Sequence, residues 1–133
     1  MFINKTDNLN ILIAGGRDYR NYKNLEEFVD KIIKDMNHEY KTVTIISGMA
    51  QGADMLGVQY SIERKYALLK FPANWQLYGK RAGFIRNKQM LDYLAESQDN
   101  GMVIAFWDGQ SSGTKHTIYT AREMKIPCFV CKY

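Results

Sequence analysis

The sequence contains little of what characterises redox, metal-binding or membrane proteins. It has only two cysteines and two histidines in 133 residues. Cys128 and Cys131 form a C-x-x-C, but they lie in an apolar, strand-like segment and not at the start of a helix, where a thiol pKa is lowered. Residues three apart in a strand face opposite sides, so we expect two small buried hydrophobic side chains. One C-x-x-C with the isolated His38 and His116 does not provide four zinc ligands, so neither a metal nor another cofactor is predicted.

Long hydrophobic runs are also missing. The longest apolar stretches, such as residues 101–107, fall far below the roughly 18 residues that a transmembrane helix needs. Residues 1–8 contain no charged region followed by an apolar stretch and a small-residue cleavage site, so no secretory signal is predicted. We therefore expect a cytoplasmic protein with no membrane partner.

The common nucleotide-binding signatures are absent as well. Neither G-x-G-x-x-G nor G-x-x-x-x-G-K-[ST] occurs, and no acidic residue ends the second predicted strand to bind a ribose. These absences argue against hydride transfer and ATP hydrolysis. Eighteen Lys and Arg against fourteen Asp and Glu give a formal charge of +4, and the cations are scattered along the chain. This balance permits an anionic ligand without requiring nucleic acid.

What the sequence does contain is an alternating pattern. Its length is typical of one domain, expected to span residues 1–133. Short β-type apolar runs alternate with amphipathic stretches, which is typical of a parallel sheet with crossover helices. Strands are predicted at 11–14, 42–47, 67–71, 102–106 and 127–131. Helices are predicted from a cap at Asn24 to about 36, from 53 to about 65, at 82–96 and at 114–124, with an irregular loop at 73–79.

Right-handed crossovers make this an α/β Rossmann-like three-layer sandwich with a five-stranded, mostly parallel sheet in the order 3-2-1-4-5. In such sheets ligands bind beyond the carboxyl ends of the strands, where the strand order reverses. That point lies between the first and fourth strands, where residues 15–17 meet the loop at 107–114. The loop at 47–54 is expected to border the same crevice.

Three strand-to-helix loops are rich in glycine and serine. Each leads into a helix N-terminus, whose free N–H groups attract phosphate or carboxylate. Residues 111–114 add hydroxyls and a glycine where backbone could approach a ligand, although an ordinary helix cap would look the same. Gly48 and Gly52 allow a tight turn, or serve backbone geometry alone.

Several charged and aromatic residues near these loops are further candidates. Arg17 has a guanidinium suited to phosphate, with a surface ion pair as the alternative. Asp54 lies in a first helical turn, where it complements the helix dipole or holds ribose hydroxyls. Trp75 and Trp107 would stack on a base, or pack over a sheet edge.

Several segments resemble a known superfamily. ISGMAQGAD at 46–54 is similar to the S-G-x-A-x-G-x-D segment of DprA, founder of the SLOG superfamily of Rossmann-like domains. Six further segments resemble the small YspA-like proteins of bacteria and phages. They are GGRDY at 15–19, FPANW at 71–75, GKRAG at 79–83, IRNKQM at 85–90, AFWDG at 105–109 and SGTKHT at 112–117. The resemblance extends over about residues 10–130 and implies a nucleotide or nucleotide-derived ligand.

The LOG branch of this superfamily contains phosphoribohydrolases, whose chemistry depends on P-G-G-x-G-T-x-x-E and an R-K pair. By this resemblance Arg86 takes the place of the arginine and residues 112–114 retain the phosphate-binding turn. Thr117 and Asn87, however, replace the glutamate and the lysine. His116 would be a substitute base or a satisfied surface histidine. The candidate catalytic residues are therefore Arg86, Asp54 and His116, and cleavage of the ligand stays open.

We predict that the protein binds a nucleotide or nucleotide-derived phosphate ligand in this crevice, with hydrolysis of an N-glycosidic or phosphoribosyl bond as the reaction if it is an enzyme. The alternatives are a non-catalytic sensor or sponge for a nucleotide signal in a phage or host-defence setting, and a DprA-like DNA-binding protein. A homo-oligomer, specifically a dimer, is expected. The ligand-binding candidates are Gly15, Gly16, Arg17, Asp18, Ser47, Gly48, Gln51, Gly52, Asn74, Trp75, Arg81, Asn87, Trp107, Asp108, Ser111, Ser112, Gly113 and Thr114.

Overall fold

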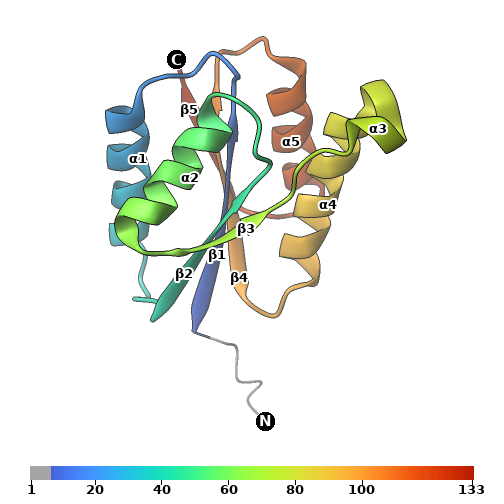
Figure 1. The fold of residues 1–133 in the computed structure, drawn as a ribbon. Helices are drawn as coiled ribbons and strands as arrows, with labels where there is room; N and C mark the ends of the chain where they lie inside the picture. The colour runs from blue at the N-terminus through green and yellow to red at the C-terminus, as the bar shows by residue number, and fades with distance from the viewer. Residues whose placement is uncertain (1–6) are drawn as a thin grey trace.

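A five-stranded parallel sheet forms the centre of the molecule (Figure 1). The computed structural model describes residues 7–133, so most of the segment considered for a secretory signal lies outside the described residues. The strands are β1 (Asn8–Gly15), β2 (Thr42–Ser47), β3 (Ala67–Lys70), β4 (Asn100–Trp107) and β5 (Cys128–Lys132). Their order is β3-β2-β1-β4-β5, and every neighbouring pair is parallel. The predicted fold class and strand order are confirmed.

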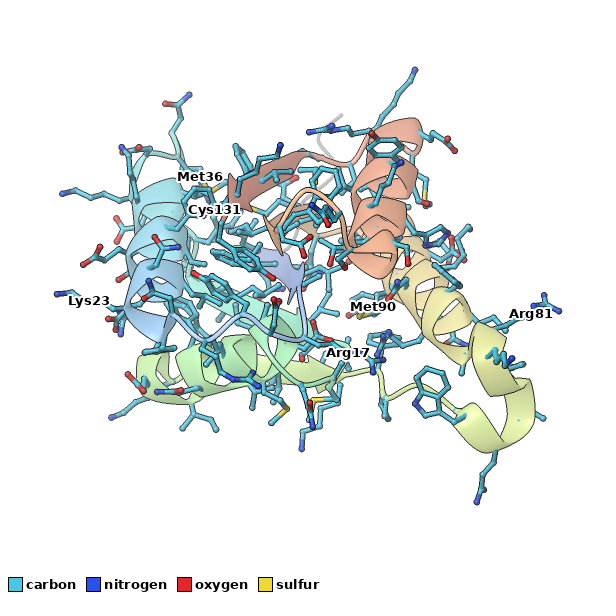
Figure 2. All side chains as sticks on the ribbon, turned by 90° about the horizontal axis from the view of Figure 1, so that it is seen from above. Arg17, Lys23, Met36, Arg81, Met90 and Cys131 are labelled. Carbon is cyan, nitrogen blue, oxygen red and sulfur yellow. The ribbon has the colours of Figure 1, made fainter. Side chains whose placement is uncertain are left out.

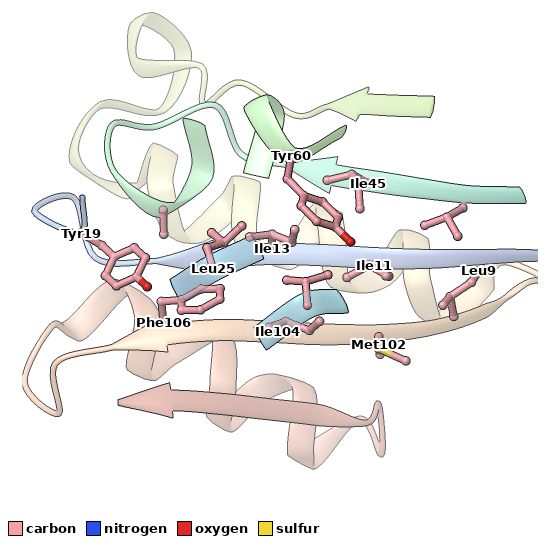
Figure 3. Packing of buried hydrophobic residues seen from close by; sticks show 13 residues of the cluster. Leu9, Ile11, Ile13, Tyr19, Leu25, Ile45, Tyr60, Met102, Ile104 and Phe106 are labelled. Atoms are coloured by element: carbon pink, nitrogen blue, oxygen red, sulfur yellow. The ribbon is translucent and has the colours of Figure 1, made fainter. Parts of the chain in front are cut away.

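Helices cover both faces of the sheet, which completes three layers (Figure 1). The four longer ones are α1 (Tyr22–Lys34), α2 (Ala53–Arg64), α4 (Ala82–Glu96) and α5 (Ser112–Glu123). Because successive strand residues face opposite sides, Ile11 and Ile13 of β1 pack with α1 and α2, whereas Leu12 packs with α4 and α5. Figure 3 shows the first of these two clusters, in which residues of β1, β2 and β4 pack with helix residues such as Leu25 and Tyr60.

The structure corrects two local predictions. Asn24 is not the cap of the first helix, because Asn21 has that position and its side chain accepts a hydrogen bond from the Asn24 backbone N–H (3.0 Å). Asn24 instead donates its side-chain amide to the Tyr19 hydroxyl (2.6 Å). The segment predicted as an irregular loop contains the short helix α3 (Trp75–Tyr78) and a 3-10 turn at Gly79–Arg81. The Asn74 side chain caps α3 by accepting from the Leu77 N–H (3.1 Å).

The two cysteines lie on opposite faces of β5, as predicted. Cys128 packs against the cluster under α4 and α5, and Cys131 packs against the cluster under α1 and α2. The predicted full burial is wrong, because β5 is an edge strand and both side chains are only partly covered. Among residues 7–133, no helix is long and apolar enough to cross a membrane.

Candidate functional site

A cleft of about 540 Å³ opens at the carboxyl ends of β1 and β4, where the strand order reverses. The β1–α1 loop, the first turn of α4 and the β4–α5 loop form its walls, and Figure 2 looks down on this end of the sheet. The sequence analysis predicted the ligand site at this position, where the strand order reverses. Predicted residues that line the cleft are Gly15, Gly16, Arg17, Asp18, Asp54, Trp75, Arg86, Asn87, Asp108, Ser111, Ser112, Gly113 and Thr114.

Gly15 and Gly52 allow neighbouring backbone segments to approach each other closely. A Cβ on Gly15 would lie 2.4 Å from the Phe106 carbonyl oxygen, and one on Gly52 would lie 2.2 Å from the Gly16 carbonyl oxygen. The same Gly16 carbonyl accepts a hydrogen bond from the Ala53 N–H (3.1 Å). Gly52 therefore explains the close packing of the β1 and β2 loops, and Gly15 the close approach of β1 to β4, without any ligand. This is the structural alternative that the sequence left open for Gly52.

Gly113 is different, because it faces open space. Apart from its chain neighbours and the backbone of its own helix turn, no heavy atom of residues 7–133 lies within 4 Å of the position that its Cβ would take, and Gly113 lines the cleft in the first turn of α5. The neighbouring Asp108 carboxylate accepts hydrogen bonds from the Gln110 and Ser111 N–H groups (2.9 and 2.8 Å), and these bonds lower the pKa of Asp108. These bonds fix the loop, and the first turn of α5 that follows it lines the cleft. The first N–H groups of a helix have no partner within the helix, so they are available to an anion.

The two glycines give a matched stability prediction. Gly52→Ala is expected to lower the free energy of unfolding by about 2 kcal/mol, because Gly52 has φ +81° and its Cβ would meet backbone. Gly113→Ala is expected to raise it by about 0.5 kcal/mol, because alanine is the better helix former and nothing obstructs its methyl group. Urea unfolding of both variants measures this difference, and equal losses in the two variants would contradict it.

Arg86 is a buried cation in the wall of the cleft. It projects from α4 and is 8% exposed. Its Nη1 donates to the Gly48 carbonyl (2.5 Å) and its Nε donates to the Asn87 side-chain oxygen (2.9 Å). Its Nη2 forms no hydrogen bond with any of residues 7–133. Burial lowers the pKa of Arg86, and the nearby Arg17 acts in the same direction against the opposing effect of Asp54.

Asp54 lies beside Arg86 at the start of α2. A Cβ on Gly48 would lie 2.8 Å from both Asp54 Oδ2 and Arg86 Nη1, so the two groups come close to each other across that glycine. Asp54 is 6% exposed, and Oδ2 accepts from the Ala50 N–H (3.2 Å). Burial raises the pKa of Asp54 from 3.8 to about 6, against the opposing effects of the Ala50 hydrogen bond, Arg86 and Arg17. A carboxyl with such a pKa in a cleft is typical of functional sites.

A second cavity of about 410 Å³ adjoins the cleft and shares Arg17, Ala50, Trp75 and Arg86 with it. Arg17 is exposed and Trp75 is 51% exposed, so both side chains are free to meet a ligand at the rim. In Figure 2 Arg17 lies in the central part of the molecule between the sheet and α4. The predicted residues Gly48 and Gln51 line this second cavity instead of the main cleft.

Six predicted residues line neither cavity. Trp107 donates its indole N–H to the Ser111 carbonyl (3.0 Å) and has Lys132 over its ring (5.6 Å), so it braces the β4–α5 loop. His116 packs edge-on against Phe84 of α4, with the ring centroids 4.9 Å apart. Arg81 points away from the centre of the molecule (Figure 2). The six are Ser47, Gly52, Asn74, Arg81, Trp107 and His116.

Sequence reasoning missed other lining residues. Lys80, Gly83 and Phe84 reach the cleft because α4 begins beside α5, and Met90, which looked like a core position, also borders it. Thr117, the residue at the LOG glutamate position, lines the cleft and donates its hydroxyl to the Gly113 carbonyl (3.3 Å). The only sequence signal near the first group is the GKRAG segment at 79–83, through its resemblance to YspA-like proteins.

Comparison with known proteins places this fold and cleft in a family. Residues 9–78 match the YspA, cpYpsA-related SLOG family, over more than half of the chain. The protein belongs to this SLOG family. The chain is also similar to the Gene 61 protein of Mycobacterium phage D29, with 27% identity over 122 residues that cover 88% of this chain and 91% of that protein. Membership of the SLOG family points to a small, nucleotide-related ligand in general.

Proposed function

We propose that this SLOG protein binds a phosphate-bearing nucleotide in the cleft at the β1/β4 switch point. The observation that carries the proposal is the sharing of one cleft by the open N-terminal turn of α5 and the buried Arg86. A helix N-terminus offers unpaired N–H groups and partial positive charge. Arg86 adds a guanidinium that retains one nitrogen without a protein partner among residues 7–133. A phosphate between them satisfies both.

The other charges of the cleft fit a ligand that combines phosphate with hydroxyl groups. Arg17 and Lys80 add positive charge, and Asp18, Asp54 and Asp108 add negative charge. Asp108 already accepts from two loop N–H groups, and Asp18 accepts from the Tyr133 hydroxyl (2.6 Å). Asp54 has one oxygen, Oδ1, without a hydrogen bond to residues 7–133, so we assign it to a ribose hydroxyl. The exposed Trp75 ring stands at the rim where the main cleft meets the second cavity.

Arg17 gives the cleanest test, because it is exposed and its loss leaves the core intact. Titration calorimetry with AMP, GMP, CMP and UMP is expected to detect binding of at least one of them. Arg17→Ala is expected to weaken that binding at least tenfold, the effect of one charge-assisted hydrogen bond of about 1.5–3 kcal/mol. Arg122→Ala, an exposed arginine in the last turn of α5, is the matched control and keeps the affinity of the wild type. An Arg17→Ala protein that binds as well as the control would contradict the proposal.

Hydrolysis of the bound nucleotide is a second candidate function, favoured by the position of Asp54. In that reaction the N-glycosidic C1′–N bond breaks, the oxygen of a water bonds to C1′, and protonated Asp54 supplies a proton to the leaving base. The attacking water releases one proton to solvent, and the Asp54 carboxylate takes one proton from solvent, which restores the acid for the next cycle. The same calorimetry mixtures, analysed for free base and ribose phosphate, distinguish this enzyme from a sensor or sponge, which would return the nucleotide unchanged.

A further inference from the structure

Five residues of the second cavity do not line the main cleft, so a mononucleotide bound in the main cleft would not contact them. We name it the outer cavity, lined by Gly48, Met49, Ala50, Gln51, Pro72, Ala73, Arg17, Trp75 and Arg86. It lies beyond the carboxyl ends of β2 and β3, on the side of the arginines away from the Asp108 loop. Its volume of about 410 Å³ lies in the range of small-molecule sites. It is large enough for a group the size of a sugar.

The outer cavity differs from the main cleft in its charge. Three carboxylates line the main cleft, whereas no Asp or Glu among residues 7–133 lines the outer cavity. Its polar groups are the two guanidiniums, the Gln51 amide and loop backbone. Its largest apolar wall is the exposed Trp75 ring. Guanidinium and amide groups hydrogen-bond hydroxyls, and an indole face packs well on the C–H face of a sugar ring. This combination suits a neutral, hydroxyl-rich group.

The floor of the outer cavity is held in place by internal hydrogen bonds. Met49 has a positive φ of 65°, and its N–H donates to the Ser47 hydroxyl (3.1 Å). The next N–H, that of Ala50, donates to Asp54 Oδ2 (3.2 Å), and Arg86 holds the Gly48 carbonyl. Each turn of the loop is thus tied to a buried residue. A preformed subsite costs less ordering on binding than a mobile loop.

Arg17 and Arg86 line both cavities, so they mark the passage from one to the other. An anionic linker is the group that two adjacent guanidiniums favour at such a passage. We propose that the outer cavity is a subsite for a sugar-like group, joined through a diphosphate at the arginines to a nucleoside in the main cleft. The ligand class is then a nucleoside diphosphate ester of a sugar. This inference rests on the proposed function, because it extends the nucleotide of the main cleft.

The experiment compares paired ligands on wild-type protein and one blocking variant. ADP, GDP, CDP and UDP are each titrated beside their glucose esters. For the best-bound base, the ester is expected to bind at least tenfold more tightly than the diphosphate. Ala73→Trp, which fills the outer cavity, is expected to remove this gain while the diphosphate affinity stays within twofold. Gln89→Trp, at an exposed α4 position that lines neither cavity, is the matched control and keeps the gain.

The outcomes separate the two proposals. Binding of a diphosphate without any gain for its ester overturns the outer-cavity subsite and leaves the proposed function intact. A gain that survives Ala73→Trp also overturns the subsite, provided that thermal unfolding shows the variant to be folded. If Ala73→Trp does not fold, Gln51→Ala replaces it, and the expected result is a several-fold loss of the ester gain only. Absence of binding by all eight compounds overturns the subsite, and it overturns the proposed function as well if the four monophosphates also fail to bind.

Discussion

Replacing Arg86 with alanine is expected to lower the free energy of unfolding by about 3 kcal/mol and to reduce nucleotide affinity at least a hundredfold. The substitution leaves the Gly48 carbonyl and the Asn87 side-chain oxygen without their donor. It also removes the cation beside Asp54, so the buried carboxylate becomes harder to ionise. Urea unfolding at pH 7.5 and calorimetry measure the two effects.

Two further variants show whether the losses of stability and affinity in Arg86→Ala come from the position of Arg86 beside Asp54. Arg81→Ala removes an exposed arginine just before the same helix, and we expect a change within about 0.5 kcal/mol and unchanged affinity. Asp54→Asn is expected to stabilise the Arg86→Ala protein by more than the same change stabilises the wild type, because the buried carboxylate that it removes has lost its nearby cation. Additive effects of Arg86→Ala and Asp54→Asn would mean that the two residues do not interact.

Asp54→Asn is expected to stabilise the ligand-free protein by about 3 kcal/mol above pH 7 while weakening nucleotide binding. The pKa of Asp54 is higher in the folded protein, about 6, than its ordinary value of 3.8. The folded state therefore binds the proton more tightly, and this group destabilises the fold progressively as the pH rises from 4 to 6. One pKa unit corresponds to about 1.4 kcal/mol, which gives the expected size of the full effect.

The measurement is the difference in unfolding free energy between wild type and Asp54→Asn across pH 4 to 8. The two proteins are expected to converge as the pH falls toward 4 and to differ fully above 7. Asp35→Asn is the control, because Asp35 is exposed and its one ion pair within residues 7–133 is an i,i+4 contact with Lys31. A constant difference between wild type and Asp54→Asn at every pH would show that Asp54 keeps its ordinary pKa in the fold.

The fold was predictable because local pattern and topology rules agree. β1 is apolar on both faces, with Ile11 and Ile13 on one face and Leu12 on the other, as a strand covered by helices on both sides requires. Right-handed crossovers then leave few possible strand orders. The ends of elements were less predictable. Asn21 and Asn24 are both reasonable caps, and only the contact of Asn24 with Tyr19 decides between them. The four-residue helix α3 lacks the periodicity that would reveal it.

The site was predictable as far as it depends on strand ends. Residues at the carboxyl ends of β1 and β4 meet in the cleft because the topology requires it. The roles of individual glycines were not predictable, because Gly52 and Gly113 differ only in which atoms approach them in space. The burial of Arg86 against Gly48 depends on how α4 packs beside the β2 loop, which no local pattern encodes. A dimer, a cytoplasmic location, a single domain and the ligand roles of the site residues stay predictions.

Backbone amide chemical shifts during a nucleotide titration test the central claim most directly. With ¹⁵N-labelled protein and the best-bound nucleotide, the largest changes are expected at Gly16, Arg17, Gly113 and Thr114, on both sides of the cleft. The opposite end of the sheet, around His38 and Tyr66, is expected to stay unchanged. Changes concentrated at that opposite end, or an unperturbed start of α5 in a protein saturated with nucleotide, would contradict nucleotide binding at the β1/β4 switch point.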